Sequence, residues 1–318
     1  MILNTKVMWS LKGKSMKYIW LFLLLLSSTV LSAQHQPLLS QYMLNGLPLN
    51  PGFTGSREAL SVAATYRNQW SGFDGAPTTS YLAIHSPLKK EALALGLVVS
   101  RDEFGVSKTT GFRLNAAYRT EFYNGKLSFG LSGGMKQVNN AWDELITQDA
   151  GDLAFQAGEV SNWLPDFGAG VYFSNKKWYA SLSLPTMTAV RYTGGNGYDT
   201  QLVAGVSHLY FNSGIKLPIN ADWEIQPSMM MRYLSGSSNQ LDLNALMNWK
   251  DTFEFGFSYR SSRQVVGIVR YYLNPQTSIA YGYDQNFGSL SRYASGSHEI
   301  TLRYDFIFRT NASSPKFF

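Results

Sequence analysis

The sequence predicts an antiparallel transmembrane β-barrel of about 14 strands, with an N-terminal segment of non-regular structure acting as a plug or a periplasmic docking piece. Three observations predict this class. Apolar and polar residues alternate along many short segments that turn residues separate. Aromatic residues make up 14% of the chain and charged residues only 15%, against the roughly 25% charged residues usual in soluble domains. The chain also begins with a segment typical of exported proteins.

That first segment has the three regions of a secretory signal. Lysines between residues 12 and 17 precede the apolar run 18–26, and small residues follow. We therefore expect residues 1–33 to be a cleaved Sec-type signal peptide, within which residues 1–15 could be an upstream extension before a start at Met16. Most of the net charge of +6 comes from lysines of this signal, so a nucleic-acid partner is not expected.

Outside the signal, no apolar run reaches the roughly 18 to 20 residues of a spanning helix, which excludes a helical membrane protein. The chain has no cysteine. Disulfides, a cysteine-based metal site and an acceptor cysteine for a lipid anchor are therefore excluded.

The strand pattern is clearest near the C-terminus, where Ile300, Leu302 and Tyr304 alternate with Thr301 and Arg303. The same period of two defines strands at 58–68, 78–86, 91–101, 110–122, 126–138, 167–174, 178–185, 203–217, 223–235, 240–249, 252–260, 264–273, 277–284 and 297–308. An even number of antiparallel strands can close without free edges, as a bilayer demands.

The connections between these strands are of two kinds. Tight polar turns, such as Asn124-Gly125, alternate with longer connections at 101–109, 140–166, 186–200, 235–240 and 286–297. Outer-membrane barrels show this asymmetry, with short periplasmic turns and long external loops. Several apolar faces end in aromatic residues, which are candidates for the membrane girdles: Tyr118, Phe122, Tyr233, Trp249, Tyr259 and Tyr271.

A large soluble β-sandwich or propeller is the alternative fold. The polar strand faces carry Arg and Glu in mid-strand, which a soluble sandwich does not explain. A water-filled or plugged barrel lumen accommodates these residues.

Residues 34–57 do not fit the barrel pattern. They are apolar, yet Gly46, Pro48 and Pro51 prevent regular structure. The segment could plug the lumen, lie across the periplasmic mouth as a docking surface, or only pack against the first strands. Its partner-binding candidates are Tyr42, Met43, Leu44, Asn45, Asn50, Pro51 and Phe53. Beyond it we expect the barrel at 58–310 and a short tail at 311–318.

A Gly-rich loop follows the first predicted strand and lies at the opposite end of the barrel from the N-terminal segment. Its partner-binding candidates are Arg67, Gln69, Trp70, Phe73 and Asp74, because exposed Arg and Trp are common interaction anchors. The alternative is conformational: the glycines make the turn, and Arg67 pairs with an acidic residue in the lumen.

Enzymatic chemistry is not expected. The four histidines form no HExxH or similar metal-binding spacing, and no GxSxG or phosphate-binding loop occurs. Ser207 and His208 are adjacent in a strand and point to opposite faces. No catalytic residue, metal or cofactor is therefore assigned.

Motifs near both ends of the mature chain resemble those of the PorP/SprF family of outer-membrane proteins associated with type IX secretion and gliding motility. They are Pro37-Leu38-Leu39-Ser40-Gln41-Tyr42-Met43-Leu44-Asn45, Asn50-Pro51-Gly52, Tyr66-Arg67-Asn68-Gln69-Trp70, Gly75-Ala76-Pro77, His85-Ser86-Pro87-Leu88 and Gly296-Ser297-His298-Glu299-Ile300. The chain departs from the family where Gly52 replaces a common alanine and where Phe53-Thr54-Gly55 replaces aromatic-Ala-Gly.

The resemblance implies a non-enzymatic outer-membrane protein that helps secrete or retain adhesin-like cargo at the cell surface. The implied partners are a surface adhesin or its sorting domain, periplasmic ring components of the machinery, and outer-membrane lipid. A diffusion porin or small-molecule transporter is the alternative. Small residues on the polar faces, among them Ala94, Gly96 and Gly130, permit a channel or a plug equally.

Overall fold

The computed structural model describes residues 39–88, 92–142, 159–192, 198–201, 208–234, 239–288 and 295–306. The predicted signal at 1–33 and the predicted tail at 311–318 lie outside them. Among the described residues, no helix has the length and hydrophobicity to cross a membrane.

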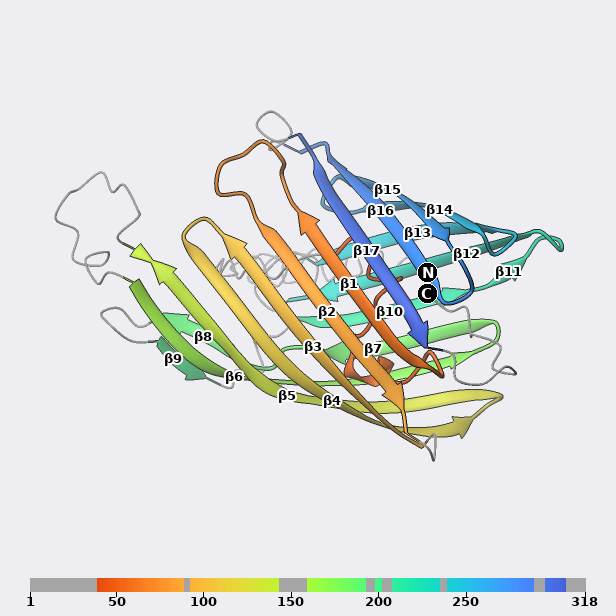
Figure 1. Ribbon diagram of the computed structural model, residues 1–318, viewed down its shortest axis with the longest axis horizontal. Coiled ribbons are helices and arrows are strands. Elements are labelled where there is room, and N and C mark those ends of the chain that lie inside the picture. Colours follow the sequence, from red (N-terminus) through yellow and green to blue (C-terminus); the bar gives the residue numbers. More distant parts are fainter. Residues whose placement is uncertain are drawn as a thin grey trace, which may run out of the picture. The chain divides into compact units, whose positions relative to one another are not determined.

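Antiparallel strands make up most of the described chain (Figure 1). The first half holds β1 (Leu60–Asn68), β2 (Thr78–Pro87), β3 (Leu93–Phe104), β4 (Ser107–Phe122), β5 (Gly125–Ala141), β6 (Glu159–Asn175), β7 (Trp178–Leu184), β8 (Ala189–Tyr192) and β9 (Tyr198–Gln201). The second half holds β10 (Leu209–Ile215), β11 (Leu217–Pro218), β12 (Trp223–Tyr233), β13 (Gln240–Trp249), β14 (Phe253–Arg260), β15 (Gln264–Tyr272), β16 (Thr277–Asn286) and β17 (Ser297–Phe306).

Fourteen of these strands form one closed antiparallel barrel. Neighbours in sequence pair throughout, β1 pairs with β17, and the circle closes where β10 pairs with β12. The remaining strands lie outside this circle: β8 and β9 form a separate hairpin, and the two-residue β11 pairs only with β12. The predicted 14-stranded barrel is confirmed.

Three of the predicted connections between strands were wrong. The connection expected at 101–109 is a tight hairpin, because β3 and β4 continue to Phe104 and Ser107. Charged residues such as Arg101 and Glu103 face outward near the tip of this hairpin. They interrupt the alternation of apolar and polar residues by which strands are recognised in the sequence. β6 begins at Glu159, inside the connection expected at 140–166. The connection expected at 186–200 contains β8 and β9.

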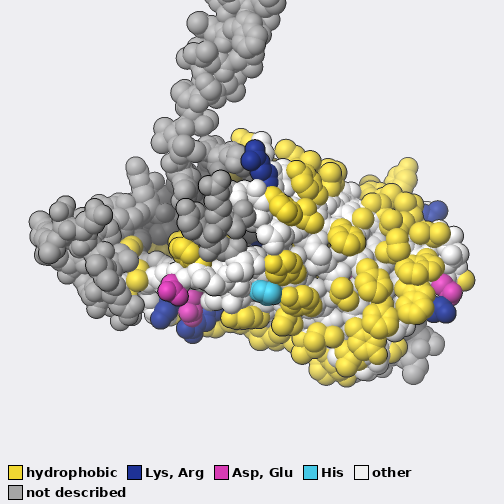
Figure 2. Space-filling model, turned by 90° about the horizontal axis from the view of Figure 1, so that it is seen from above, with side chains coloured by type: hydrophobic (Ala, Val, Ile, Leu, Met, Phe, Trp, Pro, Cys, Tyr) yellow, Lys and Arg dark blue, Asp and Glu magenta, His cyan; other side chains and the backbone are white. Residues whose placement is uncertain are grey.

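Burial along the strands is inverted relative to a soluble protein. In β17, Glu299, Thr301 and Arg303 are buried, while Ile300 and Leu302 are about half exposed. Figure 2 shows the result from outside, with apolar side chains over most of the visible face and charged groups toward its margins. Such an apolar outer band around a polar interior is the pattern of a barrel that lies in lipid.

Aromatic rings cluster on the outer face at one end of this band. Trp249 lies 6.1 Å from both Trp223 and Phe253, and Phe253 lies 4.8 Å from Tyr271, measured between ring centroids. Aromatic side chains favour the membrane interface, so this cluster marks one girdle of the barrel.

The two ends of the barrel differ. One end, called here the short-turn end, carries tight turns such as residues 123–124 and 176–177, the start of β1 and the end of β17. The other, called the long-loop end, carries the connections 69–77, 142–158 and 185–208.

Candidate functional site: a plugged lumen and a loop platform

Residues 39–57, called here the plug, occupy the interior of the barrel. Not one of them is exposed. Instead of regular structure they form successive turns, for example Leu44 N–H to Gln41 O at 2.8 Å and Asn50 N–H to Gly46 O at 3.0 Å. One turn of 3-10 helix, η1 (Pro51–Phe53), follows, and Asn50 caps it through its side chain.

The plug is held at the long-loop end by a charged cluster called here the latch: Ser40, Gln41, Arg67, Asp284 and Glu299. The backbone N–H groups of Ser40 and Gln41 each donate to one oxygen of the Glu299 carboxylate, at 2.7 Å. Arg67 pairs with Glu299 at 3.1 Å and with Asp284 at 2.6 Å. All five residues are buried, and the charged side chains pair with one another inside the lumen.

A second pair of charges lies beside the latch. Arg260 and Asp242 are fully buried and pair at 3.1 Å. Arg260 also donates to the carbonyl of Leu39 at 3.5 Å, and Asn244 contacts the hydroxyl of Tyr42 at 2.6 Å. Strands β13 and β14 therefore also hold the plug.

The middle of the plug supplies the apolar core of the barrel. Its buried apolar side chains are Leu39, Tyr42, Met43, Leu44, Leu47 and Phe53. They form one cluster with inward side chains from around the wall: Ala83, Val98, Tyr172, Tyr179, Tyr210, Met230, Leu246, Val266, Ile268 and Ala280. Removing the plug would expose this whole cluster to water, which makes the plug part of the folded core.

Two wall glycines make room for the plug. A Cβ at Gly130 would collide with the backbone of Pro51 and Gly52, and a Cβ at Gly170 would collide with the side chain of Asn50. Asn50 in turn donates to the carbonyl of Val171 at 3.1 Å. From the sequence, Gly130 permits a channel or a plug equally, and in the structure the plug occupies the space beside it.

At the short-turn end, charges again fix the segment. Arg57 pairs with Asp305 of β17 at 2.7 Å, and both are buried. Glu58 pairs with Arg119 and, at 3.0 Å, with Lys126. The segment that leads into β1 is thus tied to β4, β5 and β17.

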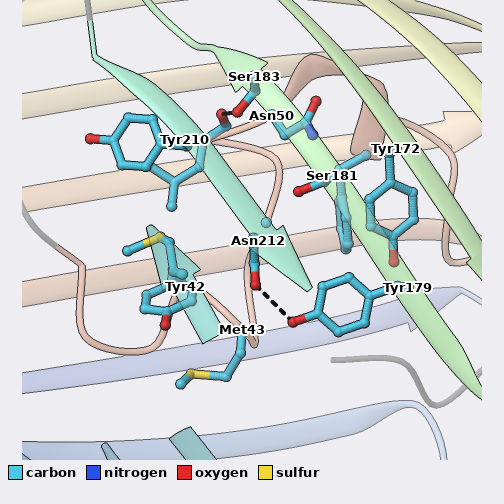
Figure 3. A pocket seen from close by; sticks show the side chains of 13 residues that line it. Tyr42, Met43, Asn50, Tyr172, Tyr179, Ser181, Ser183, Tyr210 and Asn212 are labelled. Carbon is cyan, nitrogen blue, oxygen red and sulfur yellow. Dashed lines mark hydrogen bonds between the residues drawn. The ribbon is translucent and has the colours of Figure 1, made fainter. Parts of the chain in front are cut away.

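A cavity of about 30 Å³ adjoins the plug on the side of β6, β7 and β10, among side chains that include Tyr42 and Met43 from the plug and Tyr210 from the wall (Figure 3). Tyr179 donates to Asn212 across its edge at 2.9 Å. This volume suits about one water molecule.

The candidate residues predicted in the N-terminal segment all lie in this packed interior: Tyr42, Met43, Leu44, Asn45, Asn50, Pro51 and Phe53. Of the alternatives left open by the sequence, the segment takes the position of a plug. In this state these side chains offer no surface to a partner.

The second group of candidates separates into two places. Arg67 faces the lumen in the latch, as in the alternative that pairs it with an acidic residue. Trp70, Phe73 and Asp74 lie in the loop between β1 and β2, where Phe73 is 53% exposed. Gln69 begins this loop with an N–H bond to the carbonyl of Pro77 at 2.9 Å.

That loop is braced by two other connections, and the three together are called here the loop platform: residues 69–77, Gly105 and 295–296. Ser71 exchanges backbone hydrogen bonds with Gly296 at 2.8 Å and Ser295 at 3.0 Å. Gly105 donates to the carbonyl of Gly75 at 2.9 Å. These bonds present Phe73 and Asp74 on a supported surface.

The sequence interpretation missed the acidic residues of the lumen as plug anchors. Asp242, Asp284 and Glu299 are each the third residue from the long-loop end of their strand, and all three face inward. An inward acidic residue at this position in three strands was the available signal. Within the described ranges, no group of three or more His, Cys, Asp or Glu residues is arranged to hold a metal ion.

A closed antiparallel barrel with an apolar outer face, a polar interior and its own N-terminal segment packed inside is a plugged outer-membrane β-barrel protein. The sequence places it more narrowly. The profile of the type IX secretion system membrane protein PorP/SprF family matches residues 31–304, and the chain belongs to that family.

Solved structures similar to this chain are also barrels. Omp33 of Acinetobacter baumannii is 7% identical with a TM-score of 0.47, over 80% of this chain and 100% of that one. The CymD monoaromatic hydrocarbon channel is 13% identical with a TM-score of 0.49, over 86% and 95%. The translocator domain of the autotransporter NalP from Neisseria meningitidis is 12% identical with a TM-score of 0.43, over 84% and 93%. Comparison with curated proteins finds no match.

Proposed function

We propose that this barrel is a non-enzymatic surface anchor of the type IX secretion and gliding machinery, which helps secrete or retain adhesin-like cargo. Membership of the PorP/SprF family supports the link to the machinery. The observation that carries the anchoring role is the plug: it completes the core of the barrel and is fixed by charges at both ends.

A lumen built this way is a poor route for a polypeptide. Passage would break the buried pairs Arg67–Glu299 and Arg57–Asp305 together with the apolar cluster. Breaking one buried ion pair by removing a partner already costs about 3–5 kcal/mol. The cargo would therefore meet the barrel at its surface rather than pass through it.

The loop platform is the proposed contact for cargo. The rule of short periplasmic turns places the long-loop end outside the cell. There Phe73 and Trp70 supply the aromatic groups and Asp74 the charge that interaction surfaces commonly use. Cargo in the form of a surface adhesin or its sorting domain would dock there, while the short turns face the periplasmic ring components.

A diffusion porin is the alternative function. It requires an open path, and the wall positions that could line one, Gly130 and Gly170, are in contact with the plug. This role would therefore need the plug to leave.

The test of the proposal is a deletion of the gene with complementation, followed by fractionation of cargo. The proposal expects adhesin to be lost from the cell surface, and the tagged barrel to co-purify with it. Purified barrel in planar bilayers should show no stable conductance. Steady conductance together with normal adhesin on the deletion strain would instead identify a porin.

A further inference from the structure

A groove lies on the outer, lipid-facing wall of the barrel, and five strands line it: β4, β3, β2, β1 and β17. They are neighbours in the barrel in this order, and Figure 1 shows them side by side. The groove has a volume of about 510 Å³, which is within the roughly 300–1,000 Å³ of small-molecule sites.

The groove forms because two small outward side chains, Ala64 and Ser80, lie among large ones. Ala64 pairs across the strands with Leu82 and Leu302, and Ser80 pairs with Tyr66. The three large side chains are all exposed on the outer face. Since paired residues lie side by side on one face of a sheet, the large side chains form walls around the two small ones.

One side of the groove is polar, because Arg101 lies opposite Ser80 in the β2–β3 pair. The Arg101 side chain is 60% exposed, and its Nε pairs with Glu103 at 2.5 Å. Within the described ranges, no hydrogen bond to its two terminal nitrogens is found. Thr110, opposite Arg101 on β4, adds a hydroxyl to the same side. A guanidinium with N–H donors to spare suits the oxygens of a phosphate group.

The outward charges at this end of β3 and β4 also favour an anion. Arg101 and Lys108 are two cations, and Glu103, which lies opposite Lys108, is one carboxylate. Asp102 between them faces inward and accepts a hydrogen bond from Thr79 at 2.6 Å. These residues lie near the long-loop end of their strands, which the rule of short periplasmic turns places in the outer leaflet.

From the groove and its charges we infer that the barrel binds one phosphorylated lipid of the outer leaflet, with an acyl chain in the groove and the phosphate on Arg101. An acyl chain suits the groove because its walls are apolar and face the bilayer, and the cation at its edge attracts an anionic head group.

This site would lie directly below the loop platform. The three parts of the platform, residues 69–77, Gly105 and 295–296, lead into or out of the same five strands. A lipid bound across β1, β2, β3, β4 and β17 would therefore support the strands that carry the platform.

Two substitutions separate the parts of the site. Ala64→Phe fills the floor of the groove, and Arg101→Gln removes the charge but keeps a polar side chain. The matched controls are Ala245→Phe, at an outward alanine of β13, and Arg263→Gln, at an exposed arginine between β14 and β15 at the same end of the barrel. Heat-modifiable migration checks that each variant is folded.

Purified barrel in detergent would be mixed with dipalmitoyl phosphatidic acid or with dipalmitoyl phosphatidylcholine, which has the same chains but a choline that neutralises the phosphate. Native mass spectrometry then counts the lipids bound to each barrel. We expect the parent protein to retain one phosphatidic acid in preference to phosphatidylcholine. Arg101→Gln should lower the binding of phosphatidic acid about fivefold, and Ala64→Phe should lower the binding of both lipids. Both controls should bind as the parent does.

The inference is overturned if the parent retains no lipid or retains both lipids equally, or if either groove variant binds phosphatidic acid as well as its control. Glu103→Gln gives a test of opposite sign, because it removes the carboxylate beside Arg101 and should bind phosphatidic acid at least as tightly as the parent; weaker binding would contradict the inference. The measurement uses no cargo, so this site and the proposed function can fail separately.

Discussion

The carboxylate of Glu299 accepts the backbone N–H of Gln41 at 2.7 Å, across a sequence separation of 258 residues. The first turn of the plug is thereby held by the last strand of the barrel. Arg67 of β1, the strand that pairs with β17, binds the same carboxylate. Closure of the barrel and placement of the plug are therefore coupled through one buried carboxylate.

Glu299→Gln should weaken the latch without removing the side chain. An amide keeps one acceptor oxygen but loses the ion pair with Arg67 and turns its NH₂ toward a backbone donor. We expect a loss of about 2–3 kcal/mol in the free energy of unfolding, measured by urea denaturation in detergent. The matched control is Glu103→Gln, whose carboxylate pairs with the 60% exposed Arg101 and should change stability by less than about 1 kcal/mol. Equal stability of the two variants would contradict a role for the latch.

Gly130→Val should disturb the plug from the wall. Its Cβ would enter the space of Pro51 and Gly52. We expect a loss of roughly 1–3 kcal/mol by overpacking, and faster proteolysis of the plug. Gly133 on the same strand is the control, because a Cβ there meets only Phe167, at 3.7 Å, and Gly133→Val should be close to neutral. If both variants behave like the parent, the plug does not pack against β5 as described.

Substitutions in the loop platform should lower cargo retention without affecting the folding of the barrel. Phe73→Ala combined with Asp74→Ala removes exposed groups of the β1–β2 loop, so heat-modifiable migration should stay unchanged. We expect a several-fold fall in the adhesin retained on cells, measured by surface immunoblot. Tyr123→Ala removes an 84% exposed aromatic from the short-turn end and should leave retention intact. A similar loss with Tyr123→Ala would argue against docking at the platform.

The sequence predicts Arg67 and Trp70 as members of one partner-binding site. The structure predicts that alanine variants of the two residues differ in stability. Arg67→Ala leaves Asp284 and Glu299 buried with fewer partners and should cost about 3–5 kcal/mol of stability. Trp70 lies in the loop, so Trp70→Ala should reduce the free energy of unfolding by less than Arg67→Ala does. It should still lower the amount of cargo retained. The comparison requires both urea midpoints and surface adhesin. Equal loss of stability would place Trp70 in the structural core as well.

The barrel could be predicted because its strands alternate regularly, and a period of two shows directly in the sequence at positions such as Ile300 and Thr301. The position of the plug could not. Residues 39–57 have no period, and their contacts lie on strands up to 259 residues away, as between Ser40 and Glu299. The polar face of β17 predicts an interior but does not say what fills it. Arg67 shows the same limit, because alternation places it on a face without naming Asp284 as its partner.

The most direct test of the central claim is to lock the plug to the wall and measure cargo. A Cβ at residue 170 would lie 2.9 Å from the Cγ of Asn50, a spacing suited to a disulfide in the double variant Asn50→Cys/Gly170→Cys. Gel mobility would report the cross-link, and the two single variants would control for the substitutions. If the barrel anchors cargo with its plug in place, oxidised and reduced cells should retain the same amount of adhesin on their surface. Loss of surface adhesin on oxidation, restored by reductant, would show that the plug must move and would contradict the account.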